Sequence, residues 1–200
     1  MPRRIAVGVS GASGSPYAAR ILSFLQENAA ALDLEPHLIF TRYGRLVWND
    51  EVGIDPDSYG FPIHGAADMT AAPASGSARF DAMVVIPCSV GCAARIAHGL
   101  SADLVGRAAD VILKERKRLV LVVRETPLSL IHLRNLTQLA EAGAVILPAS
   151  PSFYSAPDSL EALLDTVTAR VLDQLDIPND RMKRWTGALN RFADVRSFGG

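Results

Sequence analysis

Short runs of β-branched residues, each long enough for one strand, constrain this chain more than any other feature. Residues 82–87 (AMVVIP) and 119–125 (LVLVVRE) are apolar almost without interruption. Strands of this kind are buried on both faces, which is typical of parallel sheets covered by helices. Shorter apolar runs at 5–10, 37–41 and 144–148 predict three further strands.

Helical segments separate the predicted strands. They include the stretch that carries Arg107 and Lys114, and residues 16–28, 43–51, 129–142 and 157–175. The alternation predicts an α/β fold, in which one domain holds a doubly wound, mostly parallel sheet of the flavodoxin/Rossmann-like kind. In such sheets ligands bind beyond the carboxyl ends of the strands.

Two regions fit no regular element. Residues 53–79 are rich in Gly, Pro, Asp, Ser and Ala, and are too long for an ordinary connection. We expect a functional or subunit-contacting loop there. Residues 176–200, which include Trp185, are expected to form a C-terminal arm beside a domain of residues 1–175.

Composition excludes several classes of protein. A hydrophobic fraction of 49% excludes a disordered chain, and a net charge of −1 gives no reason to expect nucleic acid as a partner. No apolar run is long enough to span a bilayer, and the short N-terminal run indicates a strand and not a signal peptide. The two cysteines, Cys88 and Cys92, are expected to be small buried thiols and not a zinc site or a disulfide. A cytoplasmic protein is the expectation.

Two turns rich in small residues follow predicted strands. Residues 8–14 (GVSGASG) open a helix, where free backbone N–H groups can cradle a phosphate and Ser10 and Ser13 add hydroxyl donors. Such turns also serve packing alone, and this one matches neither the P-loop nor the dinucleotide fingerprint. Residues 87–91 repeat the arrangement, with Ser89 as a plain helix N-cap in the alternative interpretation.

Three cations and one carboxylate follow the second turn: Arg107, Lys114, Arg124 and Glu125. We expect them to converge near the tips of neighbouring strands, which suits an anionic, phosphate-bearing ligand. Residues 114–118 contain a basic run that would ordinarily be a solvated helix end. Arg124 differs because it ends a buried strand, where a charge requires a partner.

Two further polar side chains point to the same place in the predicted fold. Tyr154 follows a strand end, and Arg170 lies on the last helix. The four histidines are scattered without metal-ligand spacing, so we expect no metal.

Together these segments resemble the UbiX/Pad family of flavin prenyltransferases, within the flavin-containing decarboxylase-like fold. The most specific stretch is RAADVILKERKRLVLVVRETPLS at 107–129. The matching stretches are 8–14, 72–77, 87–89, 107–129, 143–154 and 170–175.

The resemblance implies a metal-independent transferase. A dimethylallyl group passes from dimethylallyl phosphate to N5 of reduced FMN, and a second bond to C6 closes a fourth ring. The product, prenylated FMN, would serve a partner decarboxylase acting on aromatic or α,β-unsaturated acids. The resemblance implies a homo-oligomer as well, with a dodecamer as the expected form, since FMN in the family lies between subunits.

The resemblance also assigns roles to residues of this sequence. FMN would be held by Gly11, Ala12, Ser13, Thr41, Ser89, Val90, Gly91, Cys92 and Arg124. Dimethylallyl phosphate would be bound by Arg107, Lys114, Tyr154 and Arg170, with Trp185 near the site. The catalytic groups would be Ser13, Glu51, Lys114 and Glu125.

Three positions depart from the family pattern. Met69 stands where the family commonly has Trp, Val90 where it has Thr, and Asp103 where it has Asn. These differences bear on prenyl transfer more than on flavin binding. Two alternatives therefore stay open: a non-catalytic FMN-binding carrier subunit, and an FMN-dependent cysteine-type decarboxylase, although the PxMNxxMW-like segment of the latter is absent.

Overall fold

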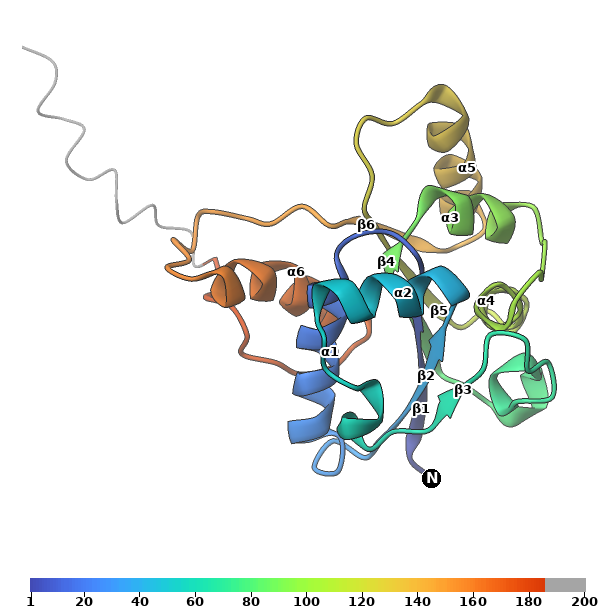
Figure 1. The fold of residues 1–200 in the computed structure, drawn as a ribbon, viewed down its shortest axis with the longest axis horizontal. Coiled ribbons are helices and arrows are strands. Elements are labelled where there is room, and N and C mark those ends of the chain that lie inside the picture. The colour runs from blue at the N-terminus through green and yellow to red at the C-terminus, as the bar shows by residue number, and fades with distance from the viewer. Residues whose placement is uncertain (186–200) are drawn as a thin grey trace, which may run out of the picture.

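A computed structural model describes residues 1–185 and contains one sheet flanked by helices (Figure 1). Its six strands are all parallel and lie in the order β3-β2-β1-β4-β5-β6. Their bounds are β1 Arg3–Val9, β2 Leu34–Phe40, β3 Ile63–His64, β4 Ala82–Cys88, β5 Arg118–Val123 and β6 Val145–Pro148. The predicted doubly wound parallel fold is confirmed.

The one strand that the sequence did not reveal is β3. It has two residues, pairs with β2, and lies inside the segment 53–79 that we expected to be irregular. The same segment contains three short 3₁₀ turns, at Pro56–Tyr59, Ala72–Ala74 and Gly76–Ala78. A strand this short shows no periodicity, so its sequence gives no signal.

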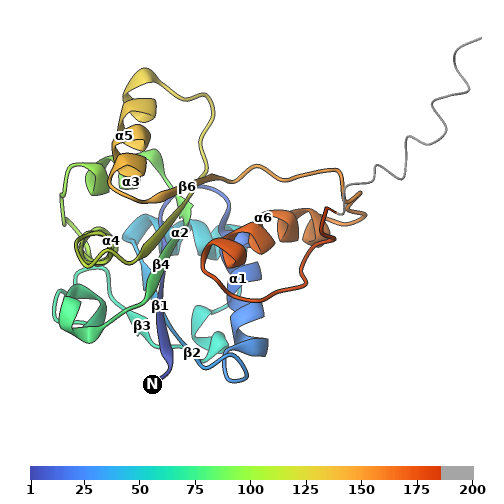
Figure 2. The ribbon, with the colours of Figure 1, turned by 180° about the vertical axis from the view of Figure 1, so that it is seen from behind.

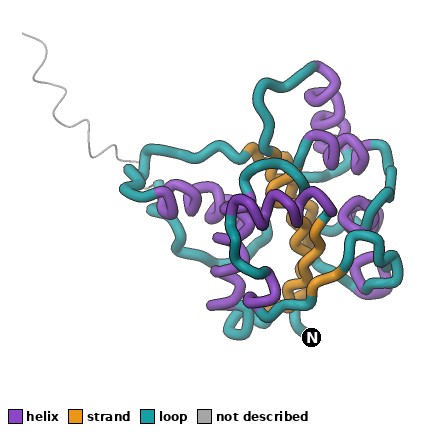
Figure 3. Tube along the Cα trace, viewed as in Figure 1, coloured by secondary structure: helices purple, strands orange, loops and turns teal. Residues whose placement is uncertain are grey.

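The described residues form six α-helices, of which α1 to α5 lie between strands and α6 follows the last strand. Figure 3 distinguishes helices, strands and loops by colour. The helices are α1 Ser15–Asn28, α2 Arg42–Glu51, α3 Val90–Ala97, α4 Leu104–Lys114, α5 Leu130–Glu141 and α6 Leu160–Gln174. Five of the six begin at a side-chain cap, with the cap residues Thr41, Ser89, Asp103, Ser129 and Ser159. Helix α1 is the exception, because its cap position is Gly14 in the left-handed region (φ 118°).

The helices cover both faces of the sheet (Figures 1 and 2). On one face α1, α2 and α6 bury residues such as Leu22, Trp48 and Leu172 against the strands. On the other face α3, α4 and α5 do the same with residues such as Val105 and Leu139. The central strands are thus buried on both sides, as their β-branched sequences predicted.

The strand order reverses direction between β1 and β4. From β1 the chain runs outward to β2 and β3, and then returns to build β4, β5 and β6 on the other side. The loops leaving β1 and β4 therefore part in opposite directions and leave a crevice at their carboxyl ends. Among the described residues, no helix has the length and apolar character needed to cross a membrane.

Candidate functional site

A cavity of ≈ 390 Å³ lies where the carboxyl ends of β1, β2 and β4 meet. We call it the switch-point cavity. Its lining residues are Ser10, Gly11, Thr41, Tyr43, Ser89, Arg95, Ala102 and Asp103. Five of them were singled out from the sequence, namely Ser10, Gly11, Thr41, Ser89 and Asp103.

Ser10 joins the two strands at this point. Its buried hydroxyl donates to the Pro87 carbonyl (2.8 Å) and accepts from the Ser89 amide (2.8 Å). Ser89 in turn accepts from the Cys92 amide (3.2 Å) and so begins α3. These hydrogen bonds fix the turns after β1 and β4 relative to each other.

Two glycines let the first turn of α2 approach the end of β1. A Cβ on Gly44 would lie 2.2 Å from the Val9 carbonyl oxygen, and one on Gly11 would lie 2.6 Å from Cβ of Tyr43. Thr41 completes this turn by accepting from the Gly44 amide (2.9 Å). Close packing of backbone against backbone therefore shapes the cavity floor.

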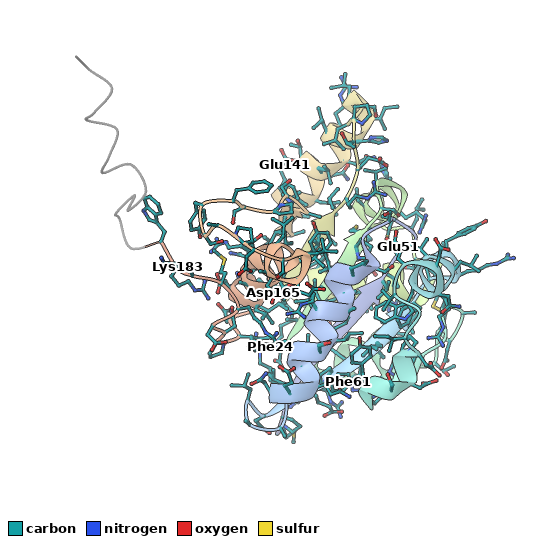
Figure 4. All side chains as sticks on the ribbon, turned by 60° about the vertical axis from the view of Figure 1, so that its left-hand side comes forward. Phe24, Glu51, Phe61, Glu141, Asp165 and Lys183 are labelled. Carbon is teal, nitrogen blue, oxygen red and sulfur yellow. The ribbon has the colours of Figure 1, made fainter. Side chains whose placement is uncertain are left out.

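Glu51, at the end of α2, supplies the cap that α1 lacks (Figure 4). Its Oε2 accepts from the amides of Gly14 and Ser15, both at 2.8 Å. These two amides therefore bind a carboxylate in the structure, while phosphate binding by the rest of the turn at 8–14 stays a prediction. A carboxylate at a helix N-terminus is stabilised by the same partial positive charge that would attract phosphate.

Ser13 and Arg124 join the same group. The Arg124 Nε donates to the Ser13 carbonyl oxygen at 2.8 Å, which gives the cation at the end of β5 the partner its position requires. Burial works to raise the pKa of Glu51, but hydrogen bonds from the Ser13 hydroxyl and the two amides, together with the Arg124 charge, outweigh it, so the pKa is lowered. Glu51 is thus ionised at neutral pH. Glu125 follows Arg124, is exposed, and accepts from the Thr126 amide (3.0 Å).

The remaining residues predicted on the β4–α3 turn are placed as follows. Val90 and Gly91 form the first turn of α3, while Cys88 and Cys92 are buried thiols, as predicted. Ala12 is buried in the turn after β1.

A second cavity of ≈ 560 Å³ lies beside α6 and is called the α6 cavity. Tyr154, Arg170 and Met182 are among the residues lining it. The ring of Trp185 meets the ring of Tyr154 edge-on, with centroids 5.9 Å apart and planes at 90°. Three residues from the predicted donor site, Tyr154, Arg170 and Trp185, are thus brought together, although residues 186–200 of the expected arm lie outside the described part of the chain.

The predicted convergence of all the cations is wrong within a single chain. Helix α4 starts near the switch-point cavity, at its cap Asp103, and runs about 15 Å to Lys114. Helix α4 ends at Lys114, four residues before β5 begins, so Lys114 lies at the amino edge of the sheet. Arg124 follows the end of β5 and therefore lies at the carboxyl edge. The Lys114 ammonium pairs there with Glu115 (2.5 Å).

Arg107 is engaged elsewhere as well. Its Nε donates to the Ala74 carbonyl oxygen (3.1 Å) and its Nη1 to Asp110 (2.9 Å). The sequence places a residue on a helix but does not say which end of the sheet that helix reaches, which is why the convergence was mispredicted.

The two departures from the family pattern other than Val90 can also be located in the fold. Asp103 caps α4 by accepting from the Gly106 amide (2.8 Å), and it pairs with Arg95 at 3.6 Å. Met69 is 44% exposed in the segment after β3. Arg95 and Tyr43 also line the switch-point cavity, and neither was predicted from the sequence. Tyr43 lies only two residues after the predicted site residue Thr41, and this proximity was a signal that could have identified it. Within residues 1–185, no cluster of three or more His, Cys, Asp or Glu could hold a metal ion.

Comparison with known proteins places this arrangement in context. The chain matches the flavoprotein family over residues 1–175. It is 46% identical over 187 residues to the flavin prenyltransferase UbiX of Deinococcus radiodurans, with 92% of this chain and 94% of that protein covered.

Two of the solved structures with the same fold are the following. The crystal structure of AnUbiX in complex with FMN and dimethylallyl pyrophosphate matches with a TM-score of 0.88 and 41% identity, covering 94% of this chain and all of that chain. A dodecameric FMN-dependent UbiX-like decarboxylase from Escherichia coli O157:H7 matches with a TM-score of 0.87 and 38% identity, covering 92% of this chain and 100% of that one.

Proposed function

This chain belongs to the flavoprotein family and, within it, to the UbiX-type flavin prenyltransferases, and on that premise we propose that it transfers a dimethylallyl group from dimethylallyl phosphate to reduced FMN. The bound flavin would supply N5 and C6, the two atoms that accept the prenyl group. The proposed product, prenylated FMN, would serve a partner decarboxylase, an inference that rests on the family resemblance.

The donor set of the switch-point cavity fits FMN. The hydroxyl oxygens of Thr41 and Ser89 each accept a backbone amide, which leaves their protons to donate to a ribityl or phosphate oxygen. Arg95 adds a cation at the cavity wall. Hydroxyls and a cation beside glycine-rich turns suit a phosphate-bearing ligand.

The observation that carries the proposal is the contact among Ser13, Glu51 and Arg124. These residues come from three separate segments. The family resemblance assigned Ser13 and Glu51 to catalysis, and Ser13 and Arg124 to FMN binding. Because the Glu51 carboxylate is ionised and within hydrogen-bonding reach of the Ser13 hydroxyl, it can accept a proton through that hydroxyl. Arg124 fixes the Ser13 backbone and therefore the position of this pair.

Tyr154 and Arg170 suit the phosphate of the donor. Departure of phosphate from an allylic carbon leaves an anion, and a hydroxyl and a guanidinium aimed at it stabilise the leaving group. Trp185 and Tyr154 present aromatic rings beside the same cavity, and such rings stabilise an allylic cation.

Lys114 and Arg107 complete the proposed donor site from another subunit. Their place on α4, with Lys114 at the opposite edge of the sheet, supports a shared site, since one chain cannot bring Lys114 to Arg124. We therefore propose a homo-oligomer, with the dodecamer as the expected form. Native mass spectrometry should give about twelve times the chain mass of 21.4 kDa, and a monomer at working concentration would contradict the shared site.

One incubation tests the proposal. The protein is mixed anaerobically with reduced FMN and dimethylallyl phosphate, with dimethylallyl pyrophosphate in a parallel reaction. The flavin is then extracted and weighed by mass spectrometry. A flavin heavier by one prenyl unit is expected with the monophosphate. Unchanged FMN in both reactions, with flavin binding intact, would favour the carrier alternative.

A further inference from the structure

One carboxylate, that of Asp173, holds two guanidinium groups beside the α6 cavity. Arg184 binds it with both of its terminal nitrogens, Nη1 to Oδ2 at 2.6 Å and Nη2 to Oδ1 at 2.8 Å. Arg170 makes a single contact, Nη1 to Oδ2 at 2.9 Å. The Asn179 amide also donates to Oδ1, at 3.1 Å. Asp173 therefore accepts two hydrogen bonds from Arg184, on both of its oxygens, and only one from Arg170.

The two arginines differ mainly in what they face. Arg170 lines the α6 cavity, and Arg184 is not among the residues that line it. The Arg170 side chain is 57% exposed and that of Arg184 is 45% exposed, whereas that of Asp173 is only 21% exposed. Two cations on one anion leave one unit of positive charge in excess. Because Arg184 takes both carboxylate oxygens, that excess charge is presented by Arg170, toward the cavity.

Without Arg184 the charge balance would change. Arg170 and Asp173 are three residues apart on α6, a spacing at which helix side chains pair readily. A free Asp173 would then pair fully with Arg170 and neutralise it. The resulting ion pair would attract a phosphate much less than an arginine with residual charge.

We propose that Arg184 is a positioning residue that occupies Asp173 and thereby keeps Arg170 available to the phosphate of the prenyl donor. This inference rests on the proposed function, in which Arg170 binds that phosphate. It differs from a purely structural interpretation, in which Arg184 only fastens residues 178–185 to α6. Arg181 offers a matched comparison, because it fastens the same segment elsewhere, to Glu27 at 2.6 Å and over the ring of Phe24 at 5.2 Å.

A double-mutant cycle on Asp173 and Arg184 separates the two interpretations. We expect Arg184→Gln to raise KM for dimethylallyl phosphate by about fivefold with kcat nearly unchanged, because a half-exposed ion pair is worth up to roughly 1 kcal/mol. Arg184→Lys keeps the charge but not the two-pronged contact, and should give an intermediate KM. Arg181→Gln should leave KM within about twofold of wild type.

The double variant Asp173→Asn with Arg184→Gln is the decisive one. It removes the neutralising carboxylate together with its partner, so KM should return to within about twofold of wild type. If Arg184 only held residues 178–185 against α6, the double variant would still lack that contact, and its KM would stay raised. Failure of the double variant to recover would therefore overturn the proposal.

Inorganic phosphate as a competitive inhibitor gives a second readout on the same variants. Its inhibition constant should follow the order of the KM values, while FMN affinity stays constant. If wild type neither binds nor turns over the donor, the proposed function fails and this inference fails with it. If wild type is active and Arg184→Gln has the wild-type KM, only this inference fails.

Discussion

The switch-point cavity and the α6 cavity are built in different ways. Hydrogen bonds between separate segments of the sheet shape the first, such as those of Ser10 and Glu51. Late segments of the chain line the second, and its cation Arg170 is held by a partly exposed ion pair. Two further predicted cations, Arg107 and Lys114, lie on α4, bound to the segment after β3 and to Glu115.

This difference suggests a division of labour. Within one chain, hydrogen bonds already fix the turns that would form its part of the proposed flavin site. The proposed prenyl-donor site needs cations that one chain places at different edges of the sheet, so we expect it to become complete only on assembly. We therefore expect substitutions in the two regions to have separable effects, on flavin affinity and stability in one case and on turnover in the other.

Lys114→Ala should have the largest effect and should act on turnover alone. Removing one group that stabilises charge in the transition state costs about 10³-fold in kcat, or about 4 kcal/mol. Prenylated flavin formed under anaerobic conditions is the measurement, with FMN affinity followed by fluorescence. Lys117→Ala is the matched control, because it belongs to the same basic run but pairs with Asp81. Full activity in the Lys114 variant would remove this residue from the site.

Mixed oligomers would test directly whether the donor site is shared. Lys114→Ala and Arg170→Ala subunits are each expected to be inactive alone. Dissociated and reassembled together, they should regain part of the wild-type activity, since some interfaces then combine an intact Lys114 with an intact Arg170. No recovery after verified mixing would place both residues in a site formed by one chain.

Gly44→Ala should have the next largest effect and should disrupt the switch-point cavity. The added Cβ would lie 2.2 Å from the Val9 carbonyl oxygen, a backbone atom that cannot turn away. We expect a loss of about 3 kcal/mol in the free energy of unfolding, measured by urea denaturation, together with weaker FMN binding. Gly65→Ala, where no heavy atom lies within 4 Å of the added Cβ, should be nearly neutral. Equal stability of the two variants would show that α2 is free to shift.

The sequence predicted the parts of the molecule that depend on local pattern. The strands β4 and β5 were found because short, almost continuous apolar runs rich in Val and Ile are typical of strands buried on both faces. The alternative interpretation of Ser89 as a helix N-cap, which came from its place after a strand, is confirmed. The two-residue strand β3 left no such pattern. The roles of Glu51 and Asp173 depend on which helix ends meet in space, and one sequence does not carry that information.

Glu51→Gln should cost about 1 kcal/mol of unfolding free energy at pH 7, because a neutral amide caps the N-terminus of α1 less well than a carboxylate. The pKa of Glu51 lies below its ordinary value of 4.5 in the fold. Its contribution is therefore complete above pH 4.5 and is lost as the pH falls through the folded-state pKa. Urea titrations of wild type and variant should converge in acid. Asp50→Asn, a change at the exposed neighbouring residue, is the control. The difference in unfolding free energy between this variant and wild type should not show the loss in acid that is expected for Glu51→Gln.

The smallest effect on stability is expected at the β2–β3 edge of the sheet. The segment that follows β3 contains Ala74, which accepts a hydrogen bond from Arg107. His64, at the end of β3, shares a hydrogen bond with His37 (Nε2 to Nδ1, 2.9 Å), and His37 contacts Glu35 at 3.0 Å. Arg4 binds the same Glu35 at 3.2 Å. Burial is the main cause that lowers the pKa of His64, and the His37 charge acts in the same direction against the opposing charge of Asp68.

Acid should therefore weaken this edge before it affects the flavin site. The folded-state pKa of His64 lies below 6.5, so the unfolded chain binds the proton first, and stability declines as the pH falls below about 6.5. We expect the unfolding free energy of His64→Asn to decline less with falling pH than that of wild type. The difference should be less than about 1 kcal/mol, since the His64 side chain is partly exposed and screened. His98→Asn, at an exposed position, is the control. FMN affinity should be the same in all three proteins between pH 6 and pH 7.5. A change confined to the His64 variant would mean that the β2–β3 edge and the switch-point cavity are coupled, and that the two regions are less separable than their contacts indicate.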